Sequence, residues 1–347
     1  MKSASGTNIR LHDVAEAAKV STATVSRTLS NPEQVSEETR AVVMRAVKET
    51  GYRVNRAARN LRKRQSGEVL VLVPNLGNPF FSQILAGIEE TFSGSEYNVL
   101  IADSLGKDAS EDSLMEYLLS SHADGIIILD GQVSKRAKQW LRENAAQHNV
   151  VFACEWVEGI EAPIVRSNNR RGAAAAIRYL HSLGHRKIAY VTGPESNVLT
   201  NFRHKGVEEE CKRLGLPMHS QWLIRGDFSM QSGYQAAEQI LDMSERPSCV
   251  FCASDQMACG VISRLHAEGI RVPQDISVMG FDDIELAEFY VPRLTTIRQN
   301  RRQLGITAAQ RVLASLRGES NADLPLECII DVELVVRDSC APLLDMA

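Results

Sequence analysis

The length and composition of the chain are typical of a globular protein with two or three domains. It has 347 residues, of which 44% are hydrophobic and 24% charged, and one domain typically takes roughly 150 residues. No apolar run approaches the roughly 18 residues of a membrane-spanning helix, and the N-terminal segment lacks the apolar stretch of a secretory signal. These features exclude an integral membrane protein and predict a cytoplasmic one.

Charge is distributed unevenly along the sequence. Residues 1–67 contain 13 Lys and Arg against 6 Asp and Glu, a net charge of +7, whereas the whole chain carries −4. The remainder is therefore strongly acidic. A basic N-terminal region followed by an acidic remainder predicts that only the N-terminal region binds a polyanion. The alternative is that the basic residues merely form a solvated face.

The basic N-terminal region is predicted to contain three short helices. Ser21 and Ser36 are candidate N-caps of the second and third helices, and Gly51 ends the third. A tight turn between the first two helices defines a helix-turn-helix, whose second helix enters the major groove of DNA with its N-terminus first. The apolar residues recur at helical spacing in segments 11–19, 21–29 and 36–52.

The segment VSTATVSRTLSNP, residues 20–32, suits the second helix of such a motif. Short hydroxyl side chains donate to phosphates, a methyl group can touch thymine, and an Arg can reach guanine. A solvated helix rich in Ser and Thr is the alternative, but it does not account for the basic linker that follows. We therefore expect DNA contacts from Ser21, Thr22, Ala23, Thr24, Ser26 and Arg27.

From residue 69 onward, apolar runs of strand length alternate with amphipathic stretches. This pattern predicts parallel sheets covered by helices on both faces, and about 280 residues are better housed in two such halves than in one. Ligands of such folds bind at the carboxyl ends of the strands. The predicted strands are 69–74, 97–103, 124–130, 150–155, 187–193, 249–255 and 276–283.

The cysteine and histidine patterns are interpreted as structural. Seven scattered cysteines argue against a disulfide framework, and the CxxC of residues 249–252 lies in a strand, where positions i and i+3 point to opposite faces. The HxxxGH of residues 181–185 falls where a helix gives way to a strand. We expect no metal or cofactor. The sequence also lacks the phosphate-loop, nucleophile-elbow and zinc-protease motifs that would support an enzyme.

Motifs along nearly the whole chain occur in an order typical of one family. They include VAEAAKVSTATVSRTLSNP, NPFFSQILAGIEE, LGHRKIAYVTGP, RGDFSMQSGY, CASDQMACG and VPQDISVMGFDDIELAEFYVPRLTTIRQ. The chain thereby resembles the LacI/GalR family of bacterial repressors, and within it the nucleoside-responsive, cytidine-type branch. The resemblance implies a transcriptional repressor, not an enzyme, whose operator affinity is controlled by a small ligand, either a nucleoside or a sugar.

The resemblance also implies an architecture. An all-α helix-turn-helix head (1–54) and a hinge helix (55–67) would precede an α/β, periplasmic-binding-protein-like domain (68–347) for effector binding and dimerisation. That domain would hold two doubly wound parallel-sheet subdomains joined by crossing strands. One subdomain would comprise about 68–166 plus 296–330, and the other about 167–295 plus the C-terminal strands.

A homodimer on a pseudo-palindromic, double-stranded DNA operator is implied as well, with a co-bound activator protein left open. The hinge helix would place Leu61 as an apolar wedge between base steps of the minor groove, while its arginines hold the backbone. An ordinary core role for Leu61 is the alternative. The hinge residues expected to contact DNA are Asn55, Arg56, Ala58, Arg59 and Leu61.

By the same resemblance, six residues are expected to contact the effector. Aromatic rings, an Arg and a buried carboxylate suit a neutral heterocyclic or polyhydroxylated ligand. The six are Phe80, Phe81, Arg203, Phe228, Asp255 and Gln299.

Each of these assignments has an alternative. The two phenylalanines of NPFFSQI could be core residues, Asp255 could cap the helix that follows it, and Arg203 could pair with Glu208 or Glu209. The sequence also departs from the family pattern at two places. Ser167-Asn168-Asn169 lacks a carboxylate expected near the cleft, and Lys19 stands where several members have Gly.

Overall fold

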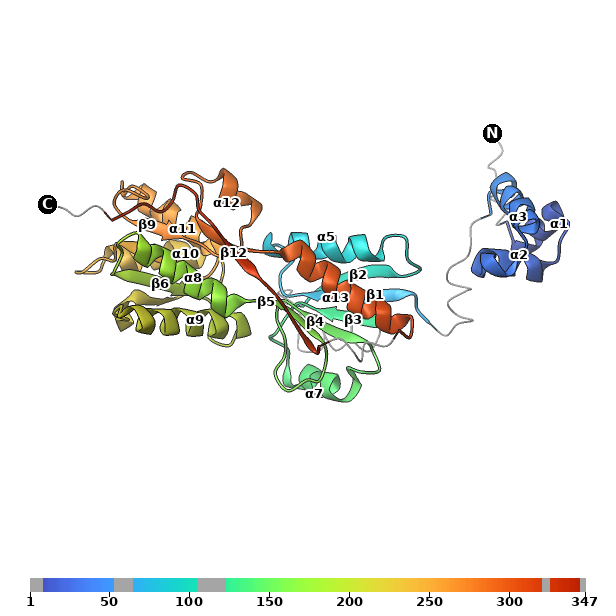
Figure 1. The fold of residues 1–347 in the computed structure, drawn as a ribbon, viewed down its shortest axis with the longest axis horizontal. Helices are drawn as coiled ribbons and strands as arrows, with labels where there is room; N and C mark the ends of the chain where they lie inside the picture. Colours follow the sequence, from blue (N-terminus) through green and yellow to red (C-terminus); the bar gives the residue numbers. More distant parts are fainter. Residues whose placement is uncertain (1–8, 53–64, 105–122, 320–324, 344–347) are drawn as a thin grey trace, which may run out of the picture. The chain divides into compact units, whose positions relative to one another are not determined.

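The computed structural model describes residues 9–52, 65–104, 123–319 and 325–343 (Figure 1). The chain divides into two compact units after Gln65. Among the described residues, the first unit is all-α and the second is α/β. The expected fold class is therefore confirmed.

The first unit contains the three predicted helices. Ser21 and Ser36 are the N-caps of the second and third, and Gly51 ends the third in a left-handed conformation with φ 70°. Val14, Val25 and Val43 are fully buried between the helices. The helices are α1 (Leu11–Ala18), α2 (Thr22–Ser30) and α3 (Glu37–Thr50), with a short 3-10 turn at Pro32–Gln34.

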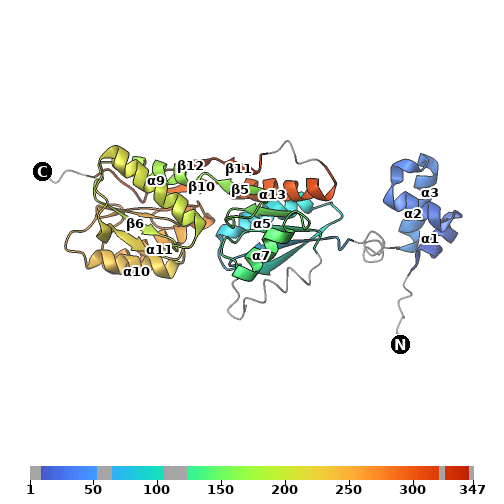
Figure 2. The same cartoon turned by 90° about the horizontal axis from the view of Figure 1, so that it is seen from below.

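The second unit begins with a six-stranded parallel sheet, which with its helices is called the first lobe. Its strand order is β11-β5-β4-β3-β1-β2. Helices α5 (Phe80–Phe92) and α13 (Arg301–Leu316) cover one face, and α7 (Lys135–Asn144) lies on the other (Figures 1 and 2). The strands are β1 (Glu68–Val73), β2 (Asn98–Asp103), β3 (Gly125–Ile128), β4 (Val150–Ala153), β5 (Ile164–Ser167) and β11 (Glu327–Ile330).

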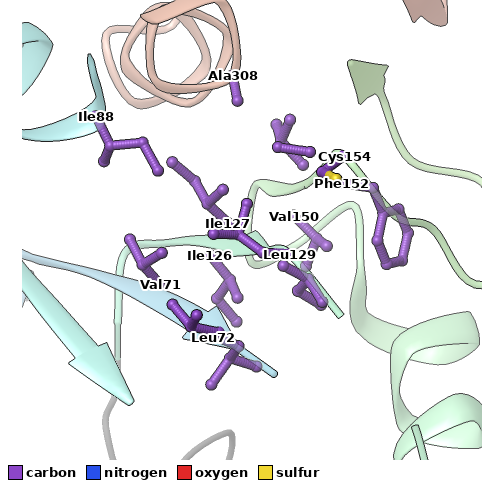
Figure 3. Close-up of a cluster of buried hydrophobic side chains, with 14 of the residues drawn as sticks. Val71, Leu72, Ile88, Ile126, Ile127, Leu129, Val150, Phe152, Cys154 and Ala308 are labelled. Carbon is purple, nitrogen blue, oxygen red and sulfur yellow. The ribbon is translucent and has the colours of Figure 1, made fainter. Parts of the chain in front are cut away.

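The core of the first lobe lies between this sheet and its helices. Figure 3 shows Ile88 of α5 and Ala308 of α13 near strand residues such as Ile127. Helices α5 and α13 approach so closely that a Cβ atom at Gly305 would lie 2.0 Å from the carbonyl oxygen of Ile84. Glycine at this position therefore allows direct backbone packing of the two helices.

The second lobe is built on a four-stranded parallel sheet with the order β7-β6-β8-β9. Helices α8 (Asn169–Ser182) and α9 (Val198–Leu214) pack as one pair, and α10 (Met230–Leu241) and α11 (Asp255–Ala267) as another. The two pairs cover opposite faces of the sheet (Figure 2). The strands are β6 (Ile188–Thr192), β7 (Leu223–Arg225), β8 (Cys249–Cys252) and β9 (Ser277–Met279).

The described chain passes between the two lobes three times. The first passage follows β5, and the second joins β10 (Thr296–Gln299) to α13. The third leads from β11 into β12 (Val332–Val335), which pairs antiparallel with β10. Figure 1 shows β12 running between the lobes. Among the described residues, no helix is long and apolar enough to span a membrane.

Candidate nucleic-acid interface and ligand cavity

The turn between α1 and α2 forms with a lysine in the position that favours glycine. Lys19 has φ 54° and ψ 40°, in the left-handed region, and its backbone N–H donates to the carbonyl oxygen of Glu16 at 3.2 Å. A non-glycine residue adopts this conformation at some energetic cost. The departure at Lys19 therefore leaves the helix-turn-helix geometry in place and adds a positive charge to the turn.

The first turn of α2 presents polar side chains to solvent. The Oγ of Ser21 accepts a hydrogen bond from the backbone N–H of Thr24 at 3.0 Å, which caps the helix. Thr22, Ala23 and Arg27 are exposed. Because Ala23 and Arg27 are four residues apart, they share one face of the helix.

Two other residues predicted to contact DNA are half-buried. The Oγ1 of Thr24 lies 2.8 Å from the Oγ of Ser21, and the carbonyl oxygen of Ser26 accepts from the Oγ of Ser30. The hinge contacts fall in a segment that the structure does not describe. These are Asn55, Arg56, Ala58, Arg59 and Leu61.

A cavity of about 200 Å³ lies where strands of both sheets end. Its walls come from the segments after β1, β3 and β4 in the first lobe and after β6, β7, β8 and β9 in the second. This is the place where parallel α/β folds bind ligands. The lining residues are Pro74, Asn75, Asn78, Phe80, Phe81, Asp130, Gln132, Glu155, Pro194, Asn197, Leu199, Arg203, Asp227, Phe228, Ser254, Gln256 and Asp282.

The structure brings four of the six expected effector residues together in this cavity. Phe80 and Phe81 begin α5, with their ring centroids 5.1 Å apart in an edge-to-face arrangement. Both are also part of the first lobe's core, so the core alternative holds alongside a lining role. Arg203 of α9 and Phe228, which has a left-handed φ of 69°, line the opposite wall.

Arg203 is buried and held from several sides. Its Nε donates to the Oδ1 of Asn169 at 2.8 Å, and its guanidinium lies over the ring of Phe281, 4.0 Å from the centroid. A further nitrogen lies 3.5 Å from the carboxylate of Asp282. The alternative of a surface pair with Glu208 or Glu209 is wrong, because Arg203 is buried, Glu208 lies beside His204 and Glu209 pairs with Arg170. The amide of Asn169 thus supplies an acceptor where the family pattern suggested a missing carboxylate.

Asp255 and Gln299 do not line the cavity, which corrects the expectation for these two residues. Asp255 is fully buried and accepts from the backbone N–H of Ile284 at 2.9 Å and from the hydroxyl of Thr296. The Nε2 of Gln299 donates to Asp282 at 2.7 Å. Asp255 is not the helix cap either, since Ser254 caps α11. Both residues support the wall from behind, whereas Asp282, which Gln299 contacts, lines the cavity itself.

Several carboxyl groups of the cavity were not singled out from the sequence. Burial raises the pKa of Glu155 to about 7 and that of Asp282 to about 6, and it raises the pKa of Asp130. Burial acts in the same direction on Asp227, but hydrogen bonds from neighbouring serines outweigh it and lower its pKa. Each follows a strand, so the position of polar residues directly after apolar runs was the available signal.

Three residues of the cysteine and histidine motifs are buried in the second lobe. Cys249 and Cys252 are fully buried free thiols in β8. His185 is buried and its ring nitrogens lie 2.9 Å from the hydroxyl of Ser248 and 3.1 Å from the carbonyl oxygen of Ala341. Within the described part of the chain, no group of three or more His, Cys, Asp or Glu could hold a metal ion.

Comparison with known proteins assigns segments of both units to known families. Residues 10–55 match the bacterial regulatory proteins of the lacI family, and residues 177–340 match a periplasmic binding protein-like domain. The chain is 37% identical to the HTH-type transcriptional repressor CytR of Escherichia coli (strain K12), over 95% of each chain. It is 32% identical to the HTH-type transcriptional repressor PurR of Vibrio vulnificus (strain CMCP6), over 95% of this chain and 98% of that one.

Solved structures give the same result. The lac repressor dimer bound to operator and the anti-inducer ONPF superposes with a TM-score of 0.81 at 30% identity, covering 96% of this chain and all of that one. A complex of the transcriptional regulator CelR with cellobiose gives 0.72 at 29% identity, covering 95% and 99%. The chain therefore belongs to the LacI family of bacterial regulatory proteins. It is a DNA-binding transcriptional repressor and not an enzyme.

Proposed function

We propose that this repressor responds to a nucleoside, such as cytidine, bound in the cavity between the lobes. The observation that carries the proposal is the composition of the cavity wall. Phe80, Phe81 and Phe228 supply aromatic faces, and the fixed guanidinium of Arg203 supplies hydrogen-bond donors. Aromatic faces stack on a flat base, while the surrounding polar groups can bind ribose hydroxyls.

The ligand controls DNA binding through the passages between the lobes. A ligand that contacts both walls stabilises one relative orientation of the lobes over others, and it thereby shifts the population of the DNA-binding state. In a dimer, such a shift would change the spacing of the two hinge helices that the resemblance implies for residues 55–67, most of which lie outside the described residues.

A homodimer is part of the proposal. Phe289, at the end of α12 (Glu285–Phe289), is 70% exposed, and Val291 is 86% exposed. Large apolar side chains that are exposed close together in the sequence suit a protein–protein contact. Each protomer would place one head on a half-site of a pseudo-palindromic operator, with α2 in the major groove and Leu61 as the minor-groove wedge.

A panel of ligands in thermal unfolding tests the proposed ligand. A ligand at a hundred times its dissociation constant stabilises the native state by about 2.7 kcal/mol. We expect a shift with cytidine or another nucleoside, and loss of that shift in Phe228→Ala, which should still bind operator without ligand. A shift with sugars alone would contradict the nucleoside and favour the alternative below.

A sugar is the second candidate ligand. One solved relative is described with cellobiose and another with ribose bound. The cavity also contains many oxygen acceptors, including Asp130, Asp227 and Asp282, which suit sugar hydroxyls. Ribose and common hexoses therefore belong in the same panel.

The DNA contacts are tested by operator binding. Leu61→Ala should weaken binding while leaving the fold intact, because it removes the wedge that kinks the duplex. Substitutions of Thr22 or Ala23 should change which half-site is preferred. A uniform loss of affinity across half-sites would instead assign those positions to phosphate contacts.

A further inference from the structure

One carboxyl group of the cavity is held from both lobes. Glu155 lies two residues after the end of β4 in the first lobe, and its Oε2 accepts from the backbone N–H of Gly131 at 3.0 Å. The side chain of Asn197, the N-cap of α9 in the second lobe, lies near enough to lower the pKa of Glu155 and partly offset its burial. Glu155 thus lies where the two walls meet, and it is 94% buried, with a relative exposure of 6%.

The backbone turns Glu155 out of the sheet and into the cavity. Cys154, the residue between β4 and Glu155, has a left-handed φ of 70°. Such a conformation is costly for a non-glycine residue and persists only where the surrounding structure imposes it. A Cβ atom at Gly131 would lie 3.1 Å from the Oε2 of Glu155, so the close approach of these segments also favours glycine.

The charges around Glu155 do not compensate for its burial. Asp130 faces it and repels its negative charge, whereas Arg203 attracts it more weakly than burial disfavours it. The nearby Cys154 carries no charge because burial raises its pKa, and Asp282 is itself paired with Arg203. No ion pair found among the described residues includes Glu155. As a result its pKa is raised to about 7, and near neutral pH the group exists in both forms.

The other cavity carboxyl groups differ from Glu155 in their partners. Asp130 accepts from the hydroxyl of Ser104 at 2.6 Å with one oxygen and from the backbone N–H of Gln132 with the other. Asp282 contacts Arg203 and Gln299. Both oxygens of Asp130 thus accept hydrogen bonds, whereas the hydrogen bond from Gly131 engages only the Oε2 of Glu155, so the Oε1 of Glu155 can carry a proton and donate it in a hydrogen bond.

We propose that Glu155 is the residue that reads the base edge of the ligand. As a neutral carboxylic acid, it donates a hydrogen bond to a ring nitrogen and accepts one from the adjacent amino group. This inference rests on the proposed nucleoside response and narrows it to a heterocycle that presents an acceptor and a donor side by side, as cytosine does. A carboxylate, which only accepts, would repel the ring nitrogen. Sugar hydroxyls would donate equally well to the charged form.

Calorimetric titration of the full-length protein with cytidine at pH 6 and pH 8 tests the assignment. The neutral fraction of a group with a pKa of about 7 falls from about 0.9 to about 0.1 over this range. We expect the affinity of the wild type to fall about tenfold, with nearly one proton taken up on binding at pH 8. Titration in two buffers of different ionisation enthalpy measures this uptake.

Two variants separate the role of Glu155 from a general effect of pH. Glu155→Gln keeps an adjacent donor and acceptor but cannot titrate, so its affinity, whatever its absolute value, should be equal at both pH values. Asp227→Asn removes a cavity carboxylate whose pKa is lowered, and it should retain the wild-type fall. Operator binding without ligand verifies that both variants are folded.

The possible failures are distinguishable. If cytidine binds equally at both pH values, or if Glu155→Gln keeps the fall, the role of Glu155 is overturned while the nucleoside proposal stands. If cytidine does not bind at either pH while ribose or a hexose does, both the nucleoside proposal and the role of Glu155 are overturned. A pH-dependent affinity for cytidine that is abolished in Glu155→Gln alone supports both.

Discussion

The guanidinium of Arg203 lies 3.5 Å from the carboxylate of Asp282, and both side chains are almost fully buried. The same guanidinium stacks on Phe281 and donates to Asn169, and it also contacts the carbonyl oxygen of Ala253. A planar fork of donors suits this set of partners, and a lysine ammonium could not reproduce it. The pair therefore fixes one wall of the cavity before any ligand arrives.

Arg203→Lys should consequently destabilise the protein. The substitution leaves acceptors of the buried network unpaired, and we expect the free energy of unfolding to fall by about 3 kcal/mol. Urea denaturation measures this loss. Arg170→Lys is the matched control, because its pair with Glu209 is exposed and should be worth less than about 1 kcal/mol. Equal losses in the two variants would contradict a structural role for the buried pair.

Substitution of Ser21 should separate helix capping from DNA binding. Asp caps a helix about as well as Ser, so Ser21→Asp should leave the thermal stability of the head nearly unchanged. If Ser21 also lies against a phosphate, the new negative charge should lower operator affinity at least tenfold, most strongly at low salt.

The corresponding change in α3 is the control for this experiment. Ser36 caps α3 through the backbone N–H of Thr39 and is not among the predicted DNA contacts. Ser36→Asp should therefore leave the thermal stability of the head nearly unchanged, and it should not cause the tenfold loss of operator affinity expected for Ser21→Asp. Unchanged operator affinity in Ser21→Asp would show that Ser21 does not lie against a phosphate of the operator.

Gly305→Ala should destabilise the first lobe, although alanine favours helices. In an open helix this change stabilises by about 1 kcal/mol. Here the added Cβ would lie 2.0 Å from the carbonyl oxygen of Ile84, which forces α5 and α13 apart. We expect a net loss of about 1–3 kcal/mol in chemical denaturation. A gain in stability would show that the two helices can separate without cost.

The stability of the unliganded protein should fall as pH rises from 5 to 8. Burial raises the pKa of Glu155 to about 7 and that of Asp282 to about 6, both above the values of the unfolded chain. The folded state therefore binds these protons more tightly. The resulting stabilisation is full below the unfolded pKa and is lost as pH rises through about 6 to 7.

Urea denaturation at pH 5, 6.5 and 8 checks this dependence. Glu155→Gln should remove about 3 kcal/mol of the change, which corresponds to the shift of its pKa. Asp227→Asn should leave the change intact, since a lowered pKa acts at more acidic pH. A wild-type protein with constant stability across this range would contradict the burial of a titrating Glu155.

The strands were predictable wherever a run of apolar residues marked them in the sequence. The seven predicted strands are long apolar runs, and each is present within a few residues. Short strands such as β7 (Leu223–Arg225) and β10 (Thr296–Gln299) carry polar residues and exist because a neighbouring strand pairs with them. Their formation depends on tertiary contacts that a local pattern does not contain.

The lining of the cavity was predictable only in part, because tertiary contacts decide which side chains reach it. Phe80, Phe81, Arg203 and Phe228 were expected from the resemblance and line the cavity. Asp255 and Asp282 both follow apolar strands, and the sequence does not reveal which carboxylate faces inward. Contacts from Thr296 and Ile284 hold Asp255 behind the wall and leave Asp282 in front.

The three passages between the lobes also set the order in which the protein can be completed during synthesis. The first lobe contains β1 to β5, but it lacks α13 and the edge strand β11 until the entire second lobe has been made. The second lobe in turn receives β12 last, paired with β10. A chain that ends after β9 would therefore lack α13 and β11 of the first lobe, together with the pair formed by β10 and β12.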